Sequence, residues 1–533
     1  MSASTKGGSF IRQAAILAAA SIFVRFIGFL YRIPLTHFIG DIGMAYYAAA
    51  YGVYTLAIAL SSGALPAAIS KLVSERIAHG KYRDAHELFK TALAFAAIVG
   101  AAVAFVVGFG ANFWIGLLRH EDAVLATRTL APTLFFVAIL QVFRGYFQGM
   151  KTALPTALSQ TVEQIFKVAF SVLLAYMFLG AATIQPSVAG ATIGSGIAAM
   201  AGLAVILFLY GLAAKDLRKR ANGDRHQYVY ESKSNQLSAI LQTALPMAIG
   251  MSIFAVSNII DIRMASSRMT IAGVFARDEI RAFTGQFTGK FLLLTTLPIS
   301  LSVALSAAVI PEITSSNVKM DTAAVRSKTN MALRLSMILS LPAAVGIAVL
   351  ANPIIALLFP RSPDGGRLLQ VGAASIVFIS LVHVLSGALQ GLGHVKLPVI
   401  AAFFGVASKI PVNYVLIAIP EINIMGAVIS TIVCYVIASI LNTYFLYKKA
   451  GILPSITGAF TRPLIASALM GMVCYVIYHT LEIFIPAAAA TIAALVVGVI
   501  SYVLFMCLIK GFKRSDLQAL PLPIKIKTLM QSL

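Results

Sequence analysis

Long apolar runs, separated by short polar or Pro/Gly-containing turns, dominate the pattern of the chain. Fourteen such runs can be counted, and each is close to the ~20 residues that a helix needs to cross the hydrocarbon core of a bilayer. None shows the two-residue alternation of a membrane-spanning strand. The pattern therefore predicts fourteen transmembrane helices, with approximate cores at 10–31, 45–69, 89–118, 123–147, 155–179, 188–210, 237–264, 283–310, 332–358, 369–389, 397–419, 424–446, 461–479 and 484–509.

Lysine and arginine residues gather in alternate turns. The turns at 71–90, 215–233 and 319–328 and the tail at 512–533 are rich in them, whereas the turns after the first, fifth, eleventh and thirteenth runs have almost none. Because basic residues mark cytoplasmic loops, we expect a multi-pass protein of the cell (cytoplasmic) membrane with both termini in the cytoplasm. The N-terminus leads into the first run without a small-residue cleavage site, which predicts that no signal peptide is removed.

The chain also repeats itself. The junction at 141–170 is echoed about 242 residues later at 383–412. The matching pairs include Val142/Val384, Gly145/Gly387, Gln148/Gln390, Gly149/Gly391, Leu154/Leu397, Pro155/Pro398 and Lys167/Lys409. Six helices per repeat is an even number, so both halves enter the membrane in the same direction, and the repeat predicts a pseudo-two-fold axis along the membrane normal.

This repeat divides the chain into predicted domains. We expect an all-α polytopic membrane protein in which two six-helix lobes are followed by two additional helices. The predicted parts are an N-lobe at 1–215, a cytoplasmic linker at 216–236, a C-lobe at 237–450, helices 13 and 14 at 451–511, and a cytoplasmic tail at 512–533.

Composition supports a membrane protein and removes several functional classes. Of the 533 residues 59% are hydrophobic and 11% are charged, against about 25% charged residues in soluble proteins. The net charge of +22 fits basic cytoplasmic loops, and no aromatic platform among the basic residues points to nucleic acid. The sequence has no nucleotide-binding loop, zinc-protease helix or nucleophile elbow, so we expect no enzyme, cofactor or metal, and the coupling ion stays open.

Charged side chains inside the apolar runs are the candidate functional residues. Exposure to lipid would cost about 2.5–3.5 kcal/mol for each, so most of them must be sheltered. Basic residues outnumber acidic ones, which leaves positive charges that an anionic substrate would neutralise. The seven residues are Arg25, Glu163, Lys167, Asp261, Arg263, Lys290 and Lys409.

Two of these cations, together with a third at the end of the first run, are predicted to line a substrate-binding cavity. Arg25 and Arg32 lie two helical turns apart on one face of the first helix, with Gly28 between them. Arg32 is placed at the outer end, where it can instead extend to the interface. Lys290 lies in helix 8, the counterpart of helix 2, and is predicted to line the cavity; a structural pair is the alternative for Arg25 and Lys290.

The remaining charges are predicted to serve binding, balance or coupling. Glu163 and Lys167, spaced i and i+4, are expected to pair with each other, although Lys167 is also a cavity candidate. Lys409 has no acid four residues before it and is a cavity candidate too. Asp261 is predicted to neutralise a cavity cation or to bind a coupling cation, and Arg263 points to another face and needs its own partner. The Gly–Gln–Gly turns supply the predicted hinge residues Gly149, Pro155, Gly391 and Pro398.

Three segments carry a resemblance to a known family. They are the opening at 16–75, the turn LQGLGHVKLP at 389–398 and the segment LLTTLPISLSVALSAAVIPEIT at 293–314. Together they resemble the MurJ/SpoVB/YtgP-type flippases of the multidrug/oligosaccharidyl-lipid/polysaccharide (MOP) exporter superfamily, over essentially the whole chain.

The resemblance implies transport of lipid II, the undecaprenyl-pyrophosphate-linked peptidoglycan precursor, from the inner to the outer leaflet. It implies a role in cell wall biogenesis and thereby in cell shape and division, with partners among cell-wall synthesis or division proteins, and a monomer. Family members place arginines in a central cationic cavity. Arg25 and Arg32 match those of helix 1 with a spacing one residue longer, and Lys290 stands where a helix 8 arginine is expected. The family's helix 2 arginine has no counterpart, because 56–70 contains no basic residue. The two extra helices imply a groove for the lipid tail.

Other functions remain open. A flippase for another lipid-linked oligosaccharide, such as a teichoic, capsular or O-antigen unit, shares the fold and the charge pattern. A cation-coupled multidrug exporter should have twelve helices and acidic cavities. A membrane-embedded enzyme would need acidic metal-binding clusters at a membrane face, and the sequence contains none that we recognise.

Overall fold

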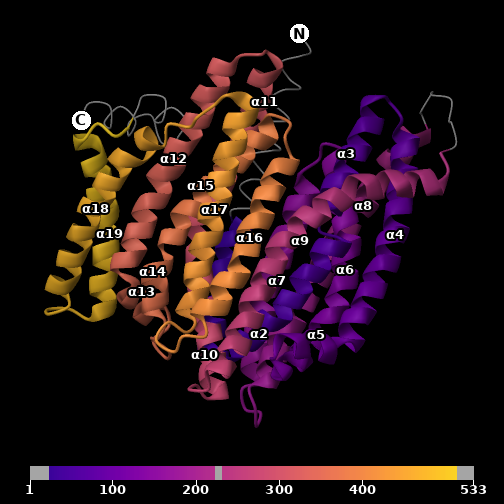
Figure 1. Ribbon diagram of the computed structural model, residues 1–533. Coiled ribbons are helices and arrows are strands. Elements are labelled where there is room, and N and C mark those ends of the chain that lie inside the picture. Colours follow the sequence, from indigo (N-terminus) through magenta and orange to yellow (C-terminus); the bar gives the residue numbers. More distant parts are fainter. Residues whose placement is uncertain (1–22, 223–230, 513–533) are drawn as a thin grey trace. The chain divides into compact units, whose positions relative to one another are not determined.

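The computed structural model describes residues 23–222 and 231–512, and in these residues the regular secondary structure is entirely helical (Figure 1). The chain forms two compact units, Met1–Ser267 and Arg268–Leu533. After a helical stretch at 23–30, the helices of the first unit are α2 (Arg32–Ser61), α3 (Leu65–Ala78), α4 (Tyr82–Phe109), α5 (Ala111–Leu118), a 3₁₀ turn (Glu121–Ala123), α6 (Val124–Gly149), α7 (Leu154–Met177), α8 (Gln185–Asn222) and most of α9 (Lys233–Ala272).

The second unit begins near the end of α9. Its helices are α10 (Arg277–Gly285), a π-helical turn (Gln286–Phe291), α11 (Leu292–Val318), α12 (Thr322–Val349), α13 (Ala351–Leu358), α14 (Gly366–Gly372), α15 (Ala374–Gly391), α16 (Lys396–Leu416), α17 (Met425–Ala450), α18 (Ile456–Leu481) and α19 (Ala487–Leu508). The boundary therefore lies within α9, after the predicted linker at 216–236.

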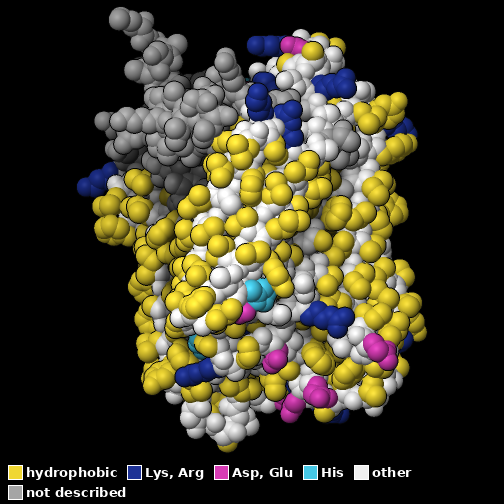
Figure 2. Space-filling model, turned by 90° about the vertical axis from the view of Figure 1, so that its left-hand side faces the viewer, with side chains coloured by type: hydrophobic (Ala, Val, Ile, Leu, Met, Phe, Trp, Pro, Cys, Tyr) yellow, Lys and Arg dark blue, Asp and Glu magenta, His cyan; other side chains and the backbone are white. Residues whose placement is uncertain are grey.

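The helices fit a polytopic membrane protein. In the described part of the chain, 12 helical segments are long and apolar enough to span a bilayer. The first predicted helix lies mostly outside the described residues, and α7 is long enough but carries Glu163 and Lys167, which lower its hydropathy. On the face drawn in Figure 2, hydrophobic side chains cover most of the described surface and charged ones are few. This is the surface that a bilayer requires.

The first helix continues further than the sequence predicted. Hydrogen bonds from the Tyr31 N–H to the Ile27 carbonyl (3.2 Å) and from the Leu35 N–H to the Tyr31 carbonyl (3.1 Å) carry it past residue 31. The break comes at Gly40, whose φ of 63° is accessible to glycine at little cost. Seven helical residues, or roughly 10 Å, separate Arg32 from this turn, and the place of Arg32 at the outer end of the first helix stays a prediction.

The two units repeat the same helix neighbours. In the first unit α6 packs against α3, α4 and α8, and in the second α15 packs against α11, α12 and α17. A methyl group added to Gly149 would lie 2.7 Å from Val73 of α3, and one added to Gly391 would lie 2.9 Å from Ile313 of α11. The repeated glycines thus let equivalent helices approach closely, which explains their place in the sequence repeat.

The hinge role of these positions stays a prediction. Pro155 and Pro398 lie in the first turns of α7 and α16, where a missing N–H costs no helical hydrogen bond. Helices α18 and α19 pack against each other and against α12, and the Tyr502 hydroxyl donates to the Ile338 carbonyl (2.8 Å). The two helices beyond the repeat are thus attached to the second unit through α12.

Candidate functional site

Two basic side chains of the first unit lie among tyrosines. The Lys167 amine, on α7, is 4.9 Å from the centre of the Tyr51 ring and 5.6 Å from that of Tyr31. Arg32, at the start of α2, interacts electrostatically with the phenol groups of Tyr31, Tyr47 and Tyr51. We call these five residues the tyrosine–cation cluster.

Helical spacing explains how α2 supplies the aromatic wall. Tyr47, Tyr51 and Tyr54 are spaced i, i+4 and i+7, so they share one face of the helix. The rings of Tyr47 and Tyr51 stack with centroids 4.4 Å apart, and Tyr54 meets Tyr51 edge-on at 5.4 Å. Hydroxyl groups fix these rings, because Tyr47 shares a 2.8 Å hydrogen bond with Tyr31, and Tyr51 bonds to the Ser195 hydroxyl on α8. The wall is therefore held on both sides of the Gly40 turn.

The charges of the cluster are not balanced. Arg32 and Lys167 interact with each other as like charges, and in the described residues neither forms an ion pair with a carboxylate. Both side chains are half-buried, so they are partly shielded from water yet accessible. Tyrosine rings and hydroxyls offset part of the desolvation cost. An anion entering the cluster would supply the missing negative charge.

The predicted pairing of Glu163 with Lys167 is wrong. The Glu163 carboxylate instead binds the Arg144 guanidinium of α6 at 2.6 Å, and the Arg144 Nε donates to the Ser159 hydroxyl at 3.1 Å. Arg144 is 5% exposed and was missing from the candidates. Its guanidinium outcompetes the local i, i+4 contact because it offers a short, buried, charge-assisted bond. Glu163 thus balances Arg144 and leaves Lys167 without an acid.

An unused donor lies beside the cluster on α7. The Gln164 Nε2 is buried and has no hydrogen-bond partner in the part of the chain that the structure describes. It faces Gly28, where an added methyl group would lie 3.2 Å away. Arg25, one turn earlier, is exposed, whereas Arg32 is half-buried. The structure therefore places the two predicted helix 1 arginines in different environments.

Lys290 has a different setting in the second unit. It lies on the π-helical turn, is 0% exposed, and donates to the Ser362 carbonyl (2.7 Å), the Ser362 hydroxyl (2.9 Å) and the Asp364 carbonyl (3.0 Å). Gly365 has a φ of 98°, and a methyl group added to it would lie 3.7 Å from the Lys290 side chain. The lysine thus fixes the loop between α13 and α14. Its predicted contact with substrate stays a prediction.

The other candidates are scattered. Lys409, the repeat partner of Lys167, is 3% exposed on α16, and Asp261 is 2% exposed on α9. Arg263 is half-buried, interacts with the like-charged Arg119, and has a buried Nη1 without a hydrogen-bond partner among the described residues. Within 23–222 and 231–512, no group of three or more His, Cys, Asp or Glu could hold a metal ion.

The tyrosines of the cluster were not among the predicted site residues. They were counted as ordinary hydrophobic residues of an apolar run. The i, i+4, i+7 spacing of Tyr47, Tyr51 and Tyr54 in a segment that must bury their hydroxyls would have found two of them, but no such spacing points to Tyr31.

Comparison with known proteins agrees with this architecture. The profile of the family described as "Polysaccharide biosynthesis protein" matches residues 10–317, and a second profile, "MatE", matches residues 246–415. The chain is 27% identical over 513 residues to the lipid II flippase MurJ of Bacillus subtilis (strain 168), with 92% of each chain covered. It is 25% identical over 437 residues to stage V sporulation protein B of the same organism, covering 81% of this chain and 83% of that one.

A solved structure has the same fold. The lipid II flippase MurJ in an inward closed conformation aligns with a TM-score of 0.69 at 16% identity, covering 93% of this chain and 98% of that chain. The resemblance inferred from the sequence and the predicted fourteen-helix fold are confirmed.

Proposed function

The chain belongs to the polysaccharide biosynthesis protein family, and on that premise we propose that it moves lipid II from the inner to the outer leaflet of the cell membrane. Relatives over nearly the full length make it a multi-pass membrane transporter of the flippase type rather than an enzyme. The lipid II headgroup, the direction of movement, the absence of nucleotide hydrolysis and the cytoplasmic termini are parts of the proposal.

The tyrosine–cation cluster is the observation that carries the proposal. Arg32 and Lys167 lie together in the first unit without a carboxylate partner in the described chain. A pyrophosphate needs several cationic or N–H donors to leave water. The planar guanidinium of Arg32 suits two phosphate oxygens, Lys167 adds a point charge, and the Gln164 amide offers a third donor.

The proposed movement follows from the different polarity of the substrate's headgroup and tail. Its polyprenyl tail remains in the hydrocarbon, so only the headgroup must be sheltered during the crossing. The headgroup binds the cluster, and the two units rearrange to expose it to each side of the membrane in turn. Neutralisation of Arg32 and Lys167 by the pyrophosphate replaces like-charge repulsion by attraction and favours the loaded state.

Other lipid-linked glycans share the pyrophosphate, so the headgroup sugar is the part to test. Purified protein in liposomes should increase the fraction of lipid II that reaches a membrane-impermeant reagent in the opposite leaflet. The same assay with undecaprenyl-pyrophosphate carrying a different glycan measures specificity. Equal movement of both would replace lipid II by a general lipid-linked oligosaccharide as the substrate.

Variants of the cluster test the binding site. Arg32→Gln and Lys167→Gln should each slow movement of lipid II by about 10–100-fold, because each loses a charge-assisted hydrogen bond of about 1.5–3 kcal/mol. Lys71→Gln is the matched control, since its exposed amine pairs only with Glu75 at 3.8 Å on the surface of α3. Unchanged transport in both cluster variants would refute the assignment.

A further inference from the structure

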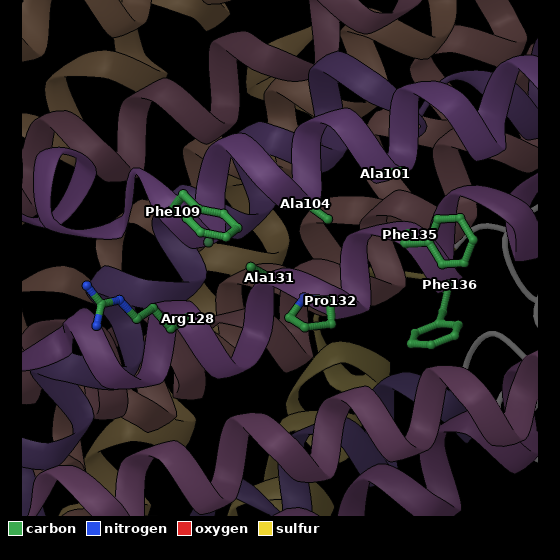
Figure 3. Close-up of a pocket in the computed structure, with 9 residues that line it drawn as sticks. Ala101, Ala104, Phe109, Arg128, Ala131, Pro132, Phe135 and Phe136 are labelled. Atoms are coloured by element: carbon green, nitrogen blue, oxygen red, sulfur yellow. The ribbon is translucent and has the colours of Figure 1, made fainter.

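An apolar groove runs between α4 and α6 of the first unit, outside the tyrosine–cation cluster. Its cavity volume is about 820 Å³, and Figure 3 shows Arg128 and Phe109 at one end and Phe135 and Phe136 at the other. The lining residues are Ala101, Ala104, Gly108, Phe109, Arg128, Ala131, Pro132, Phe135 and Phe136. Arg128 is the single polar side chain among them.

Small residues create this groove. Ala101, Ala104 and Gly108 recur at i, i+3 and i+7, so they lie along one face of α4. A methyl group added to Gly108 would lie 3.3 Å from the Ala131 Cβ, which shows how closely the helices approach at the floor. Larger side chains on the same face would fill the space.

The end of the groove at Arg128 suits a phosphate. The Arg128 side chain is exposed, and in the described residues it forms no ion pair. Arginine binds phosphate oxygens with two parallel N–H donors. An apolar groove with one arginine at its end is complementary to a hydrocarbon chain attached to an anionic headgroup.

The length of the groove distinguishes between lipids. The eight-residue step from Ala101 to Phe109 spans about 12 Å of helix. Half of a bilayer's hydrocarbon core is about 15 Å thick, the depth that one phospholipid acyl chain occupies. A polyprenyl chain is several times longer and would leave most of its length outside.

We propose that this groove binds one acyl chain of an anionic phospholipid from the surrounding leaflet, with the lipid phosphate against Arg128. The site is independent of the proposed transport of lipid II. By the predicted orientation, Arg128 lies at the non-cytoplasmic end of α6, so the lipid comes from the outer leaflet.

Photocrosslinking tests this site directly. The full-length protein is reconstituted in nanodiscs containing phosphatidylglycerol with a diazirine on one acyl chain, and labelled peptides are identified by mass spectrometry. We expect labelling of the facing stretches 101–109 and 128–136. Ala104→Phe should fill the groove, and Arg128→Gln should remove the phosphate contact; each should lower labelling about tenfold.

Two control variants change residues that do not line the groove. Ala102 is exposed on α4 but does not line the groove, so Ala102→Phe should label as the wild type does. Arg119→Gln removes another exposed arginine, the residue that follows α5. It should leave labelling unchanged, because Arg119 does not line the groove. Equal labelling in Ala104→Phe and Ala102→Phe would overturn the proposal.

Competition with unlabelled lipids shows whether the groove prefers a phospholipid or a polyprenyl chain. Unlabelled phosphatidylglycerol should displace the photoreactive lipid, whereas phosphatidylcholine at the same concentration should compete less, because its headgroup has no net charge. Undecaprenyl phosphate that displaces the label more strongly than phosphatidylglycerol would identify the groove as a polyprenyl site and sink the phospholipid assignment.

Discussion

Lys167 and Lys290 show how differently the two units treat a buried cation. In the first unit Lys167 contacts aromatic rings and a like-charged arginine, and is half-buried. In the second unit Lys290 is fully buried and donates three hydrogen bonds to a loop more than 70 residues away. A basic residue at membrane depth is therefore not sufficient evidence for a binding site. What its N–H groups contact decides between a structural role and a role in binding.

Lys167 and its repeat partner Lys409 also differ in their surroundings. Lys167 and Lys409 occupy equivalent positions in the sequence, yet Lys409 is 3% exposed whereas Lys167 is half-buried. The preceding helices of the repeat, α6 and α15, have matching neighbours and matching contacts at Gly149 and Gly391. Duplication thus preserved the packing, while the accessibility of the lysine differs between the two units.

The largest effect is expected from removing the structural lysine. Lys290→Met leaves two carbonyls and one hydroxyl without their donor, which should lower the free energy of unfolding by about 3 kcal/mol or more. Lys167→Met removes a charge that is repelled by Arg32 and should leave stability unchanged or slightly higher. Thermal unfolding in detergent, followed with a thiol-reactive fluorophore or by tryptophan fluorescence, measures the stability of both variants.

One outcome for Lys290→Met would contradict the structural role of Lys290. If Lys290→Met unfolds like the wild type but no longer moves lipid II, its contacts with the loop are not structural and it belongs with the substrate-binding residues. Lys290→Arg is a useful third variant, because it keeps the charge but cannot reproduce the three bonds of a compact ammonium.

An intermediate effect should come from disturbing the charge balance beside the cluster. Arg144→Met frees the Glu163 carboxylate, which then reaches Lys167 four residues along the same helix. Lys167 would be neutralised, and transport should fall by roughly thirtyfold, or about 2 kcal/mol. Transport in liposomes measures the change.

A double variant tests whether the freed Glu163 carboxylate is what neutralises Lys167. Arg144→Met combined with Glu163→Gln removes both charges and should restore most of the transport, a coupling that a double-mutant cycle quantifies. Equal loss in the single and double variants would mean that Arg144 acts through the packing of α6 and α7 and not through Lys167.

Much of the fold could be predicted from the sequence because it depends on local patterns. Apolar runs of membrane length indicate the helices, and the paired glycines indicate the repeat. The break between the first two runs was predicted, but its place at Gly40 was not, because apolar residues continue on both sides of that glycine. Its positive φ is a backbone property that a run of apolar residues does not reveal.

The site was less accessible because it depends on contacts between distant elements. Lys167 was identified from the cost of burying charge and Arg32 from its helical spacing to Arg25. The choice of Glu163 for Arg144 instead requires α6 and α7 to be placed side by side. The bonds of Lys290 require a loop at 359–366 that no local spacing connects to it. Sequence reasoning finds the charges that need partners, and the tertiary fold selects the partners.

The smallest effect should come from the hydroxyl groups that stand between the cations. Tyr31→Phe keeps the ring near Lys167 but removes the 2.8 Å hydrogen bond to Tyr47, so substrate binding should weaken about fivefold, equivalent to ~1 kcal/mol. Tyr54→Phe is the control, because the structure gives its hydroxyl no hydrogen bond among the described residues, although its ring packs on Tyr51. Binding of lipid II to the purified protein measures both. If Tyr31→Phe binds normally while Tyr31→Leu does not, the ring face and not the hydroxyl stabilises the cations, and the cluster works through cation–π contacts alone.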